Sequence, residues 1–414
     1  MLARLSRHML LLLVSNVGGA GLSFLLSILI GRALGSEGLG EYAVVLAWVY
    51  PLSLLVEFGL GTLATRDLAR EVATSAAYLH TVTRARLLLG GIAMLALLVL
   101  APLLSSDPVI VTGLVVSAPM VILVPFTSAF TAVFKARGAM YPIPWLNIGM
   151  LVAQVLLTSA VLAAGGGVVL ALAVNTLTSL GQLIAAWAIW RWRFHTAVGA
   201  RAVLSLGALL RRAFPFALAG LFAALQIRLS ILLLENLATT ADVGAFAAAN
   251  RFVEAARLVP NAFFGALLPA LATLAAQPDA LHHTFRRSML GLSAFGLAAG
   301  VGISLLAPWL VTSTYGEGFA PAVPVLQVLV WSLVFNVLRG GRTLYWYALG
   351  REMQVNVVNG AVILLQIALS LALIPPLGAV GAALGMIAVE AAALALLWRE
   401  IRLPARWSLS DARP

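Results

Sequence analysis

The sequence lacks cysteine altogether and has little charge of either sign. Only 10% of its 414 residues are Asp, Glu, Lys or Arg, against about 25% in soluble globular domains. Without thiols the chain has no disulfide bonds and no thiolate metal sites. Its five histidines, of which only His282 and His283 are adjacent, do not form a metal-ligand set of the usual spacing. We therefore predict that the protein has no metal site and no cofactor.

Familiar catalytic motifs are missing as well. The only lysine, Lys135, follows Phe134 and precedes Ala136, so the chain lacks the Gly-Lys-Ser/Thr sequence with which a P-loop holds nucleotide phosphates. It also lacks the HExxH motif of metalloproteases. These absences predict a protein that is not an enzyme and has no catalytic residues. A membrane-embedded transferase remains an open alternative.

Apolar residues make up 62% of the chain and occur in long runs. A helix needs about 20 mainly apolar residues to cross a bilayer, whereas a barrel strand needs about 9 to 11 with alternating polarity. Twelve runs have the helical length and leave no room for a large soluble domain, which predicts an all-α polytopic membrane protein. The predicted spans are residues 9–31, 42–62, 87–104, 109–133, 143–164, 168–190, 213–234, 244–274, 288–312, 322–348, 354–376 and 379–398.

The basic residues between the spans are distributed unevenly. With the N-terminus on the cytoplasmic side, 20 of them fall in cytoplasmic segments and only Arg32 falls outside. This bias is the positive-inside signature, and it predicts that both termini are cytoplasmic. The topology, together with contact with anionic lipid headgroups, accounts for the net charge of +11. We therefore predict membrane lipids, and no nucleic acid, as partners.

The two halves of the chain repeat several residues at a nearly constant spacing. Because each half contains six spans, both halves enter the membrane in the same orientation, which predicts a parallel pseudo-twofold repeat. We predict an N-lobe at 1–190, a cytoplasmic linker with an amphipathic segment at 191–212, and a C-lobe with a short cytoplasmic tail at 213–414. At an offset of 204, Gly40, Tyr42, Ala43 and Gly61 match Gly244, Phe246, Ala247 and Gly265; at 212, Gly138, Asn147 and Gly166 match Gly350, Asn359 and Gly378.

Eight charged residues fall inside the predicted spans. A charge at the centre of a transmembrane helix costs about 2.5 to 3.5 kcal/mol on insertion scales, so these side chains should face a wet cavity or a partner. On the eighth span, Asn250, Glu254, Arg257 and Asn261 form one stripe, because successive helical residues are rotated by about 100°. The cations are Arg228, Arg251, Arg257, Arg339 and Arg342, and the acids are Glu57, Glu254 and Glu390.

The cations in the spans outnumber the acids, and we predict that the surplus binds an anion that crosses the membrane in steps. Simpler interpretations stay open: an arginine of the eighth span can neutralise Glu254, others can extend to headgroups, and the other acids can hydrogen-bond neighbouring helices. The predicted substrate-binding residues are Arg251, Arg257, Glu254, Arg339, Arg342 and Arg228, and the possible coupling carboxylates are Glu57 and Glu390.

Several segments resemble the polysaccharide transporter family, which includes the O-antigen (Wzx-type) flippases. The resemblance extends over nearly the whole chain in order. It implies the fold of the multidrug/oligosaccharidyl-lipid/polysaccharide (MOP) superfamily, in which two six-helix bundles open alternately to either side. The segments are GRALGSEGLGEYAVV, EFGLGTLATRDLAR, VGAFAAANRFVEAARLVPNAFFGALLPALATL, LLAPWLVTSTYGEGFAPAVPVLQVL, YALGREMQVNVVN and LIPPLGAVGAALGMIAVE.

The resemblance also implies a function and a location. The substrate would be an undecaprenyl-diphosphate-linked oligosaccharide, moved from the cytoplasmic to the outer leaflet of the bacterial cytoplasmic membrane. Polysaccharide polymerase and other glycan-assembly proteins would be partners. The cationic cavity positions of the family fall on Arg251, Arg257, Arg228 and Arg339 of this sequence.

Two other kinds of function remain as alternatives. Drug and cation antiporters of the same superfamily, the MATE-like transporters, typically carry acids in the first and seventh spans. Here the first span has no charge between Met9 and Ile30, and the seventh carries Arg228. A net-positive cavity would also repel a cationic drug. The second alternative, a structural protein of an assembly complex, predicts that no charged residue of the spans matters.

Overall fold

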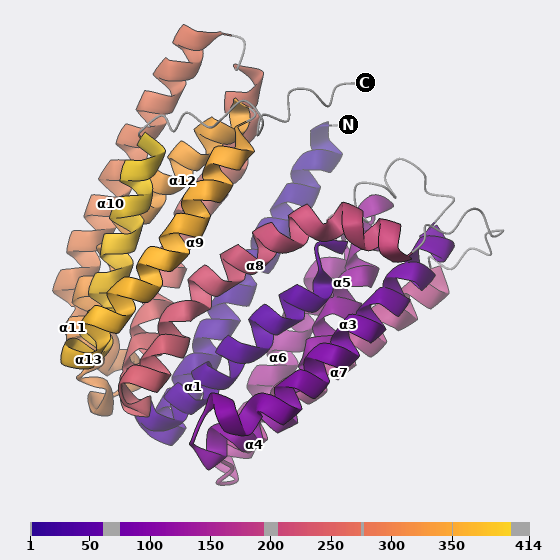
Figure 1. Ribbon diagram of the computed structural model, residues 1–414, viewed down its shortest axis with the longest axis vertical. Helices are drawn as coiled ribbons and strands as arrows, with labels where there is room; N and C mark the ends of the chain where they lie inside the picture. The colour runs from indigo at the N-terminus through magenta and orange to yellow at the C-terminus, as the bar shows by residue number, and fades with distance from the viewer. Residues whose placement is uncertain (1, 61–74, 194–205, 275–276, 350, 399–414) are drawn as a thin grey trace. The chain divides into compact units, whose positions relative to one another are not determined.

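The computed structural model describes residues 2–60, 75–193, 206–274, 277–349 and 351–398 (Figure 1). Within these ranges the regular structure is helical, and no strand occurs. The chain forms two compact units, Met1–Arg228 and Leu229–Pro414. Most of the predicted amphipathic linker, residues 194–205, lies outside the described residues.

The first unit begins with the long helix α1, which a glycine divides. Gly35 has φ 72° and ψ −172°, a conformation that interrupts a helix and that residues with a Cβ rarely adopt. The 56 residues of α1 would extend about 84 Å at 1.5 Å per residue, nearly three times a bilayer core, so the break lets the chain turn back and cross again. The helices are α1 (Leu2–Glu57), α3 (Ser75–Leu104), α4 (Pro108–Ser117), α5 (Met120–Ala136), α6 (Pro142–Ala163), α7 (Val168–Arg193) and most of α8 (Leu206–Leu237).

The second unit ends with a similarly divided helix, α13. Its break lies at Gly378, with φ 53°, and a Cβ at this position would lie 2.9 Å from Oδ1 of Asp242. Asp242 also closes the capping box with Thr239 that begins α9. The remaining elements are α9 (Thr240–Thr273), α10 (Pro278–Tyr315), the 3₁₀ turn η2 (Glu317–Phe319), α11 (Ala322–Leu329), α12 (Ser332–Ala348) and α13 (Glu352–Trp398).

The helix lengths confirm the predicted fold class. Nine helical segments of the described chain are long and apolar enough to cross a membrane, with α4–α5 and α11–α12 each forming one segment. Two of them, Ser15–Glu57 and Met353–Trp398, have 43 and 46 residues and contain the glycine breaks, so each provides two crossings. With α8, which has 32 residues, the described chain supplies the twelve predicted spans. The protein is a multi-pass helical membrane protein.

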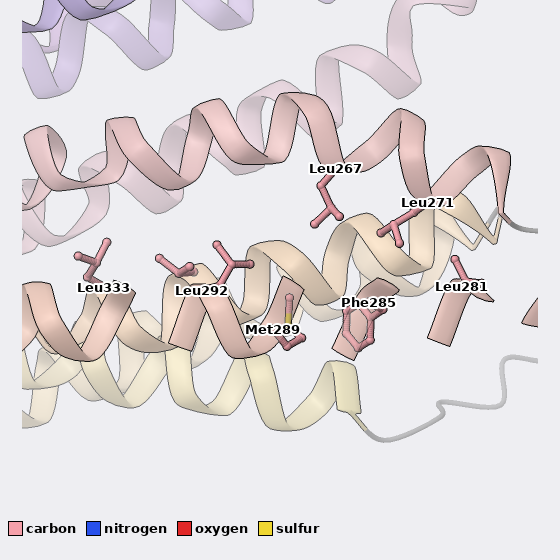
Figure 2. Close-up of a cluster of buried hydrophobic side chains, with 8 residues drawn as sticks. Leu267, Leu271, Leu281, Phe285, Met289, Leu292 and Leu333 are labelled. Atoms are coloured by element: carbon pink, nitrogen blue, oxygen red, sulfur yellow. The ribbon is translucent and has the colours of Figure 1, made fainter. Parts of the chain in front are cut away.

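A hydrophobic cluster holds α9, α10 and α12 together in the second unit (Figure 2). Glycines on α12 permit this close packing: a Cβ on Gly341 would lie 2.0 Å from Cε of Met289, and one on Gly340 would lie 2.5 Å from Cζ of Phe264. The packing fixes α12 against α9, which carries the polar stripe. The cluster comprises Leu267 and Leu271 of α9, Leu281, Phe285, Met289 and Leu292 of α10, and Leu333 and Val337 of α12.

Candidate functional site

The first polar group of the second unit lies on α9 alone. Glu254 accepts hydrogen bonds on both carboxylate oxygens: Nδ2 of Asn250 donates to Oε1 at 3.0 Å, and Nη1 of Arg251 donates to Oε2 at 2.9 Å. Residues three and four positions apart share a helix face, so α9 needs no neighbour to build this group. The side chains of the ion pair keep 26% and 33% of their exposure. The structure therefore contains the local pair between Arg251 and Glu254 that the sequence left open.

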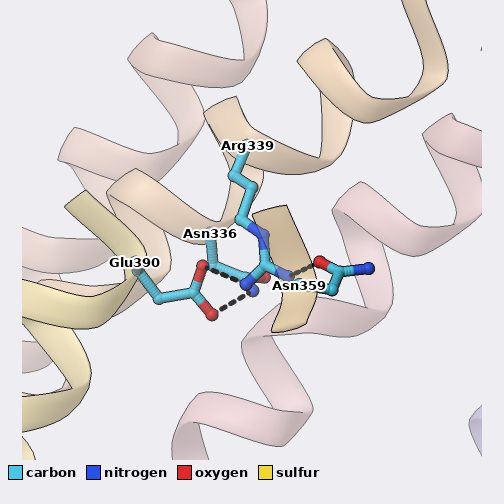
Figure 3. Close-up of polar contacts among 4 residues, drawn as sticks. All are labelled: Asn336, Arg339, Asn359 and Glu390. Carbon is cyan, nitrogen blue, oxygen red and sulfur yellow. Dashed lines mark hydrogen bonds and ion pairs between the residues drawn. The ribbon is translucent and has the colours of Figure 1, made fainter. Parts of the chain in front are cut away.

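The second polar group joins α12 to the two arms of α13 (Figure 3). Arg339 donates from Nη1 to Oε2 of Glu390 at 3.0 Å and from Nη2 to Oδ1 of Asn359 at 2.9 Å. Asn336 donates from Nδ2 to the other oxygen of Glu390 at 3.0 Å. The Arg339 and Glu390 side chains keep only 12% and 7% of their exposure. Every charged atom of Glu390 is thus satisfied in a low-dielectric environment.

The guanidinium of Arg257 interacts electrostatically with charges of both groups but makes no hydrogen bond with either in the described chain. Its Nε and Nη2 atoms are buried, and they find no hydrogen-bond partner in the part of the chain that the structure describes. The charges of Glu390, Glu254 and Arg339 all act on its guanidinium. A buried cation without hydrogen bonds is costly, and an anion that reached it would remove much of that cost. Among the described arginines of the second unit, Arg257 is the one whose buried donor atoms lack a hydrogen-bond partner.

Arg342 has a different environment. Its guanidinium is within 4.9 to 5.7 Å of four aromatic ring centroids, a cation–π geometry. Its Nε donates to the carbonyl oxygen of Leu397 at 3.2 Å. The positive charge is therefore held in a fixed position at the ends of α12 and α13. The rings belong to Phe285, Tyr345, Trp346 and Trp398.

The other two predicted site residues belong to the first unit. Arg228 lies over the ring of Tyr50, with 5.5 Å from its Cζ to the ring centroid. Glu57 of α1 accepts a hydrogen bond from Oγ of Ser128 on α5 at 2.6 Å, which is the interhelical bond that the sequence left open. The second unit therefore contains five of the six predicted binding residues, all except Arg228, together with Glu390.

Two asparagines and one further arginine make contacts that the predicted binding residues do not include. Asn336 binds Glu390 and Asn359 binds Arg339, and these interhelical hydrogen bonds join α12 to α13. The spacing of Asn336 and Arg339, three residues apart on one helix, was the available signal. In the first unit, Arg86, one residue before the predicted span 87–104, lies inside α3 with no exposure and donates from Nη1 to the carbonyl oxygen of Pro125. No pattern in the sequence pointed to that contact.

Several solved structures share the fold of this chain. A multidrug resistance MATE family transporter of the MOP superfamily, in an inward-facing conformation, matches with a TM-score of 0.77 at 16% identity over 91% of this chain and 92% of its own. The lipid II flippase MurJ, in an inward closed conformation, matches with a TM-score of 0.78 at 13% identity over 93% of this chain and 86% of its own. At such identities these matches establish the fold, which is that of the MOP superfamily transporters.

A third match concerns a MOP superfamily transporter from Pyrococcus furiosus, described as having a binding pocket of reverse polarity that suggests a different function. It has a TM-score of 0.66 at 14% identity over 94% of both chains. No curated protein matches the sequence.

The family follows from the sequence itself. The model of the polysaccharide biosynthesis protein family matches residues 5–275, which is more than half of the chain. The protein therefore belongs to this family, and the predicted resemblance and superfamily fold are confirmed.

Proposed function

We propose that the protein is a flippase that moves an undecaprenyl-diphosphate-linked glycan from the cytoplasmic to the outer leaflet by alternating access of its two lobes. The single observation that carries the proposal is the buried guanidinium of Arg257, whose Nε and Nη2 lack partners among the described residues. A guanidinium offers several N–H donors in one plane and binds phosphate oxygens in pairs. A diphosphate headgroup would supply the missing acceptors and the missing negative charge.

The other arginines extend the pathway along the spans. Arg342 lies one turn beyond Arg339 on α12 and meets the headgroup first, while Arg339 adds its positive charge and stays bound to Glu390 and Asn359. Arg257 and Arg251 on α9 then hold it, and Arg228 offers a further cation. The aromatic rings around Arg342 make it a fixed charge that attracts the headgroup without changing its own packing. The lipid tail stays in the bilayer throughout. Opposed rigid lobes around a site near the membrane midplane are a common solution for such carriers.

This function places the protein in a bacterial cytoplasmic membrane with both termini in the cytoplasm. The structural relatives are transporters, in keeping with a role that involves no catalysis. The lipid II flippase MurJ has the same fold, and its substrate, as its name states, is a lipid-linked molecule. Membrane lipids surround the protein, and polysaccharide polymerase and other glycan-assembly proteins are its proposed partners.

A MATE-like drug or cation antiporter is the second candidate, and the structural match to a MATE family transporter favours it. In that function Glu57 or Glu390 would be essential and the arginines dispensable. The contacts of Glu390 argue against this role, because Arg339 and Asn336 already occupy both of its oxygens. A carboxylate neutralised by a guanidinium has little affinity left for a cationic drug.

The test is leaflet exchange in liposomes that contain the purified protein and a fluorescent undecaprenyl-diphosphate-linked oligosaccharide, without ATP. A membrane-impermeant quencher then reports the lipid in the outer leaflet. We expect exchange by the wild type and at least about tenfold slower exchange by Arg257→Ala, since a charge-assisted hydrogen bond to phosphate is lost. Arg287→Ala is the matched control, because Arg287 is an exposed arginine of the same unit. Equal rates for Arg257→Ala and the wild type would refute the role of Arg257.

A further inference from the structure

The acids of the second unit compete with any anionic ligand for the arginines of the site. Glu254 and Glu390 each bind one arginine and one asparagine. Among the cations on α9, only Arg257 is left without a hydrogen bond in the described chain. A diphosphate that joins a lipid to a sugar has one ionised oxygen on each phosphorus and so carries two negative charges. Arg257 alone falls one charge short, and Arg251, the other arginine of α9, can supply a second free positive charge when it gives up its carboxylate.

The two existing ion pairs differ in how readily they open. Releasing Glu390 from Arg339 would leave a carboxylate without its cation on a side chain that is only 7% exposed. Such a buried charge is strongly destabilising. Releasing Glu254 from Arg251 would not leave a fully buried charge, because the Glu254 and Arg251 side chains are already 33% and 26% exposed. Pairs of this kind contribute little, so an incoming phosphate can displace Glu254 at small cost.

The position of Glu254 on α9 gives it a second possible partner. Arg251 precedes it by three residues and Arg257 follows it by three, so both arginines have the helical spacing for an ion pair with the same carboxylate. In the structure Glu254 pairs with Arg251, while its charge also acts on Arg257. Asn250, one turn before Glu254, holds the remaining oxygen. Glu254 is thus an anion built between the two cations that the substrate needs.

We propose that Glu254 is an internal competitor of the diphosphate. Without substrate, Glu254 neutralises Arg251. When the diphosphate binds, its second phosphate displaces Glu254 from Arg251, and when the diphosphate leaves, Glu254 pairs with Arg251 again. This role rests on the proposed function and adds a regulatory residue to the same site. A carrier must bind its substrate weakly enough to let it go on the far side. An anion tethered to the same helix lowers the affinity for the ligand in every turnover without being consumed.

The experiment measures binding of undecaprenyl diphosphate, and in parallel inorganic pyrophosphate, to the purified full chain in detergent, by calorimetry. We expect Glu254→Gln to bind both probes about threefold to fivefold more tightly, the range that corresponds to loss of one partly exposed ion pair. Glu254→Asp keeps the charge and should stay close to the wild type. Glu317→Gln is the matched control, because it removes an exposed acid elsewhere in the unit and reports any general change in the electrostatic field.

The outcomes separate the two proposals. Unchanged or weaker binding by Glu254→Gln, in a variant that elutes and melts like the wild type, would overturn the competitor role and leave the flippase standing. Equal tightening by Glu317→Gln would also overturn it, because the effect would then be a general one. If the wild type bound neither probe, the proposed function would fail and the competitor role with it. Tightening seen with pyrophosphate alone would uphold the competition but assign the site to a free diphosphate, against the flippase.

Discussion

The two ion pairs of the second unit are almost equal in length and very different in construction. Arg251 and Glu254 are 2.9 Å apart on a single helix, and both side chains keep a quarter or more of their exposure. Arg339 and Glu390 are 3.0 Å apart, come from different helices and are largely buried. Bond length therefore says little about what each pair does. The burial of a pair is more informative, because desolvation makes it far more costly to break a buried pair than an exposed one.

The difference suggests a division of roles. The buried pair, with Asn336 and Asn359, fastens α12 to both arms of α13 and so keeps the scaffold rigid. In the proposed transport cycle, the partly exposed pair can open and close at small cost. Between them, Arg257 keeps buried donor atoms that no described residue satisfies. A set of substitutions can test whether the buried pair provides rigidity and the partly exposed pair opens during transport.

The largest expected effect comes from breaking the buried pair on one side only. Arg339→Leu would leave Glu390 without a cation in an apolar environment, and we expect it to lower stability by about 3 to 5 kcal/mol. Thermal unfolding in detergent, followed by intrinsic tryptophan fluorescence, measures the loss. The double variant Arg339→Leu/Glu390→Leu is the control and should recover most of the stability, because no unpaired charge remains. A double variant as unstable as the single one would contradict the burial argument.

A smaller effect is expected when the same group loses a neutral member. Asn359→Ala removes the acceptor for Nη2 of Arg339 but leaves the ion pair with Glu390 in place. An unsatisfied buried donor on a charged group costs about 1 to 3 kcal/mol, so stability should fall by that amount in the same unfolding assay. Asn356→Ala on the exposed side of α13 serves as the comparison, and the two variants should not melt at the same temperature.

Breaking the local pair should change stability very little. We expect Arg251→Ala to lower the free energy of unfolding by less than about 1 kcal/mol. A partly exposed ion pair spaced by three residues on one helix contributes only a few tenths of a kcal/mol. Its transport rate should nevertheless fall, because a cation that we propose binds the second phosphate is gone. A melting temperature as low as that of Arg339→Leu would show that the two pairs are energetically alike and would remove the basis for the comparison.

The smallest expected effect is the response to salt. Between about 0.1 M and 1 M ionic strength the screening length falls from about 10 to 3 Å, which weakens exposed charge interactions and hardly affects buried ones. The stability difference between the wild type and Arg251→Ala should therefore shrink at high salt, while that between the wild type and Arg339→Leu should persist. The measurement is the same pair of melting curves at two salt concentrations. A parallel decline of both differences would contradict the separation.

Much of the fold was predictable because membrane crossing is a matter of length. The apolar runs of about 20 residues predicted the twelve spans. The structure adds the two breaks at Gly35 and Gly378, where φ is positive, each between two predicted spans. The pair of Arg251 and Glu254 was also predictable, since three residues of one helix suffice to build it. The predicted lobe bounds and the roles of the site residues stay predictions.

Contacts between distant parts of the chain were not predictable. Arg339 binds Asn359 and Glu390, which lie 20 and 51 positions further along, and nothing in the intervening sequence specifies that register. The same applies to the ring of Trp398 against Arg342 and to the buried position of Arg86. Helix packing decides these contacts, and it depends on which small residues let two helices approach, as Gly340 and Gly341 do on α12.

By itself the sequence determined that this is a helical membrane protein with charges in its spans, because hydrophobic length and helical periodicity are local properties. The tertiary structure alone decided which of those charges are neutralised. In the folded chain Glu390 pairs with Arg339 and Glu254 pairs with Arg251, whereas Nε and Nη2 of Arg257 are buried without a partner among the described residues. That selection depends on distances between helices, which no local pattern of residues encodes.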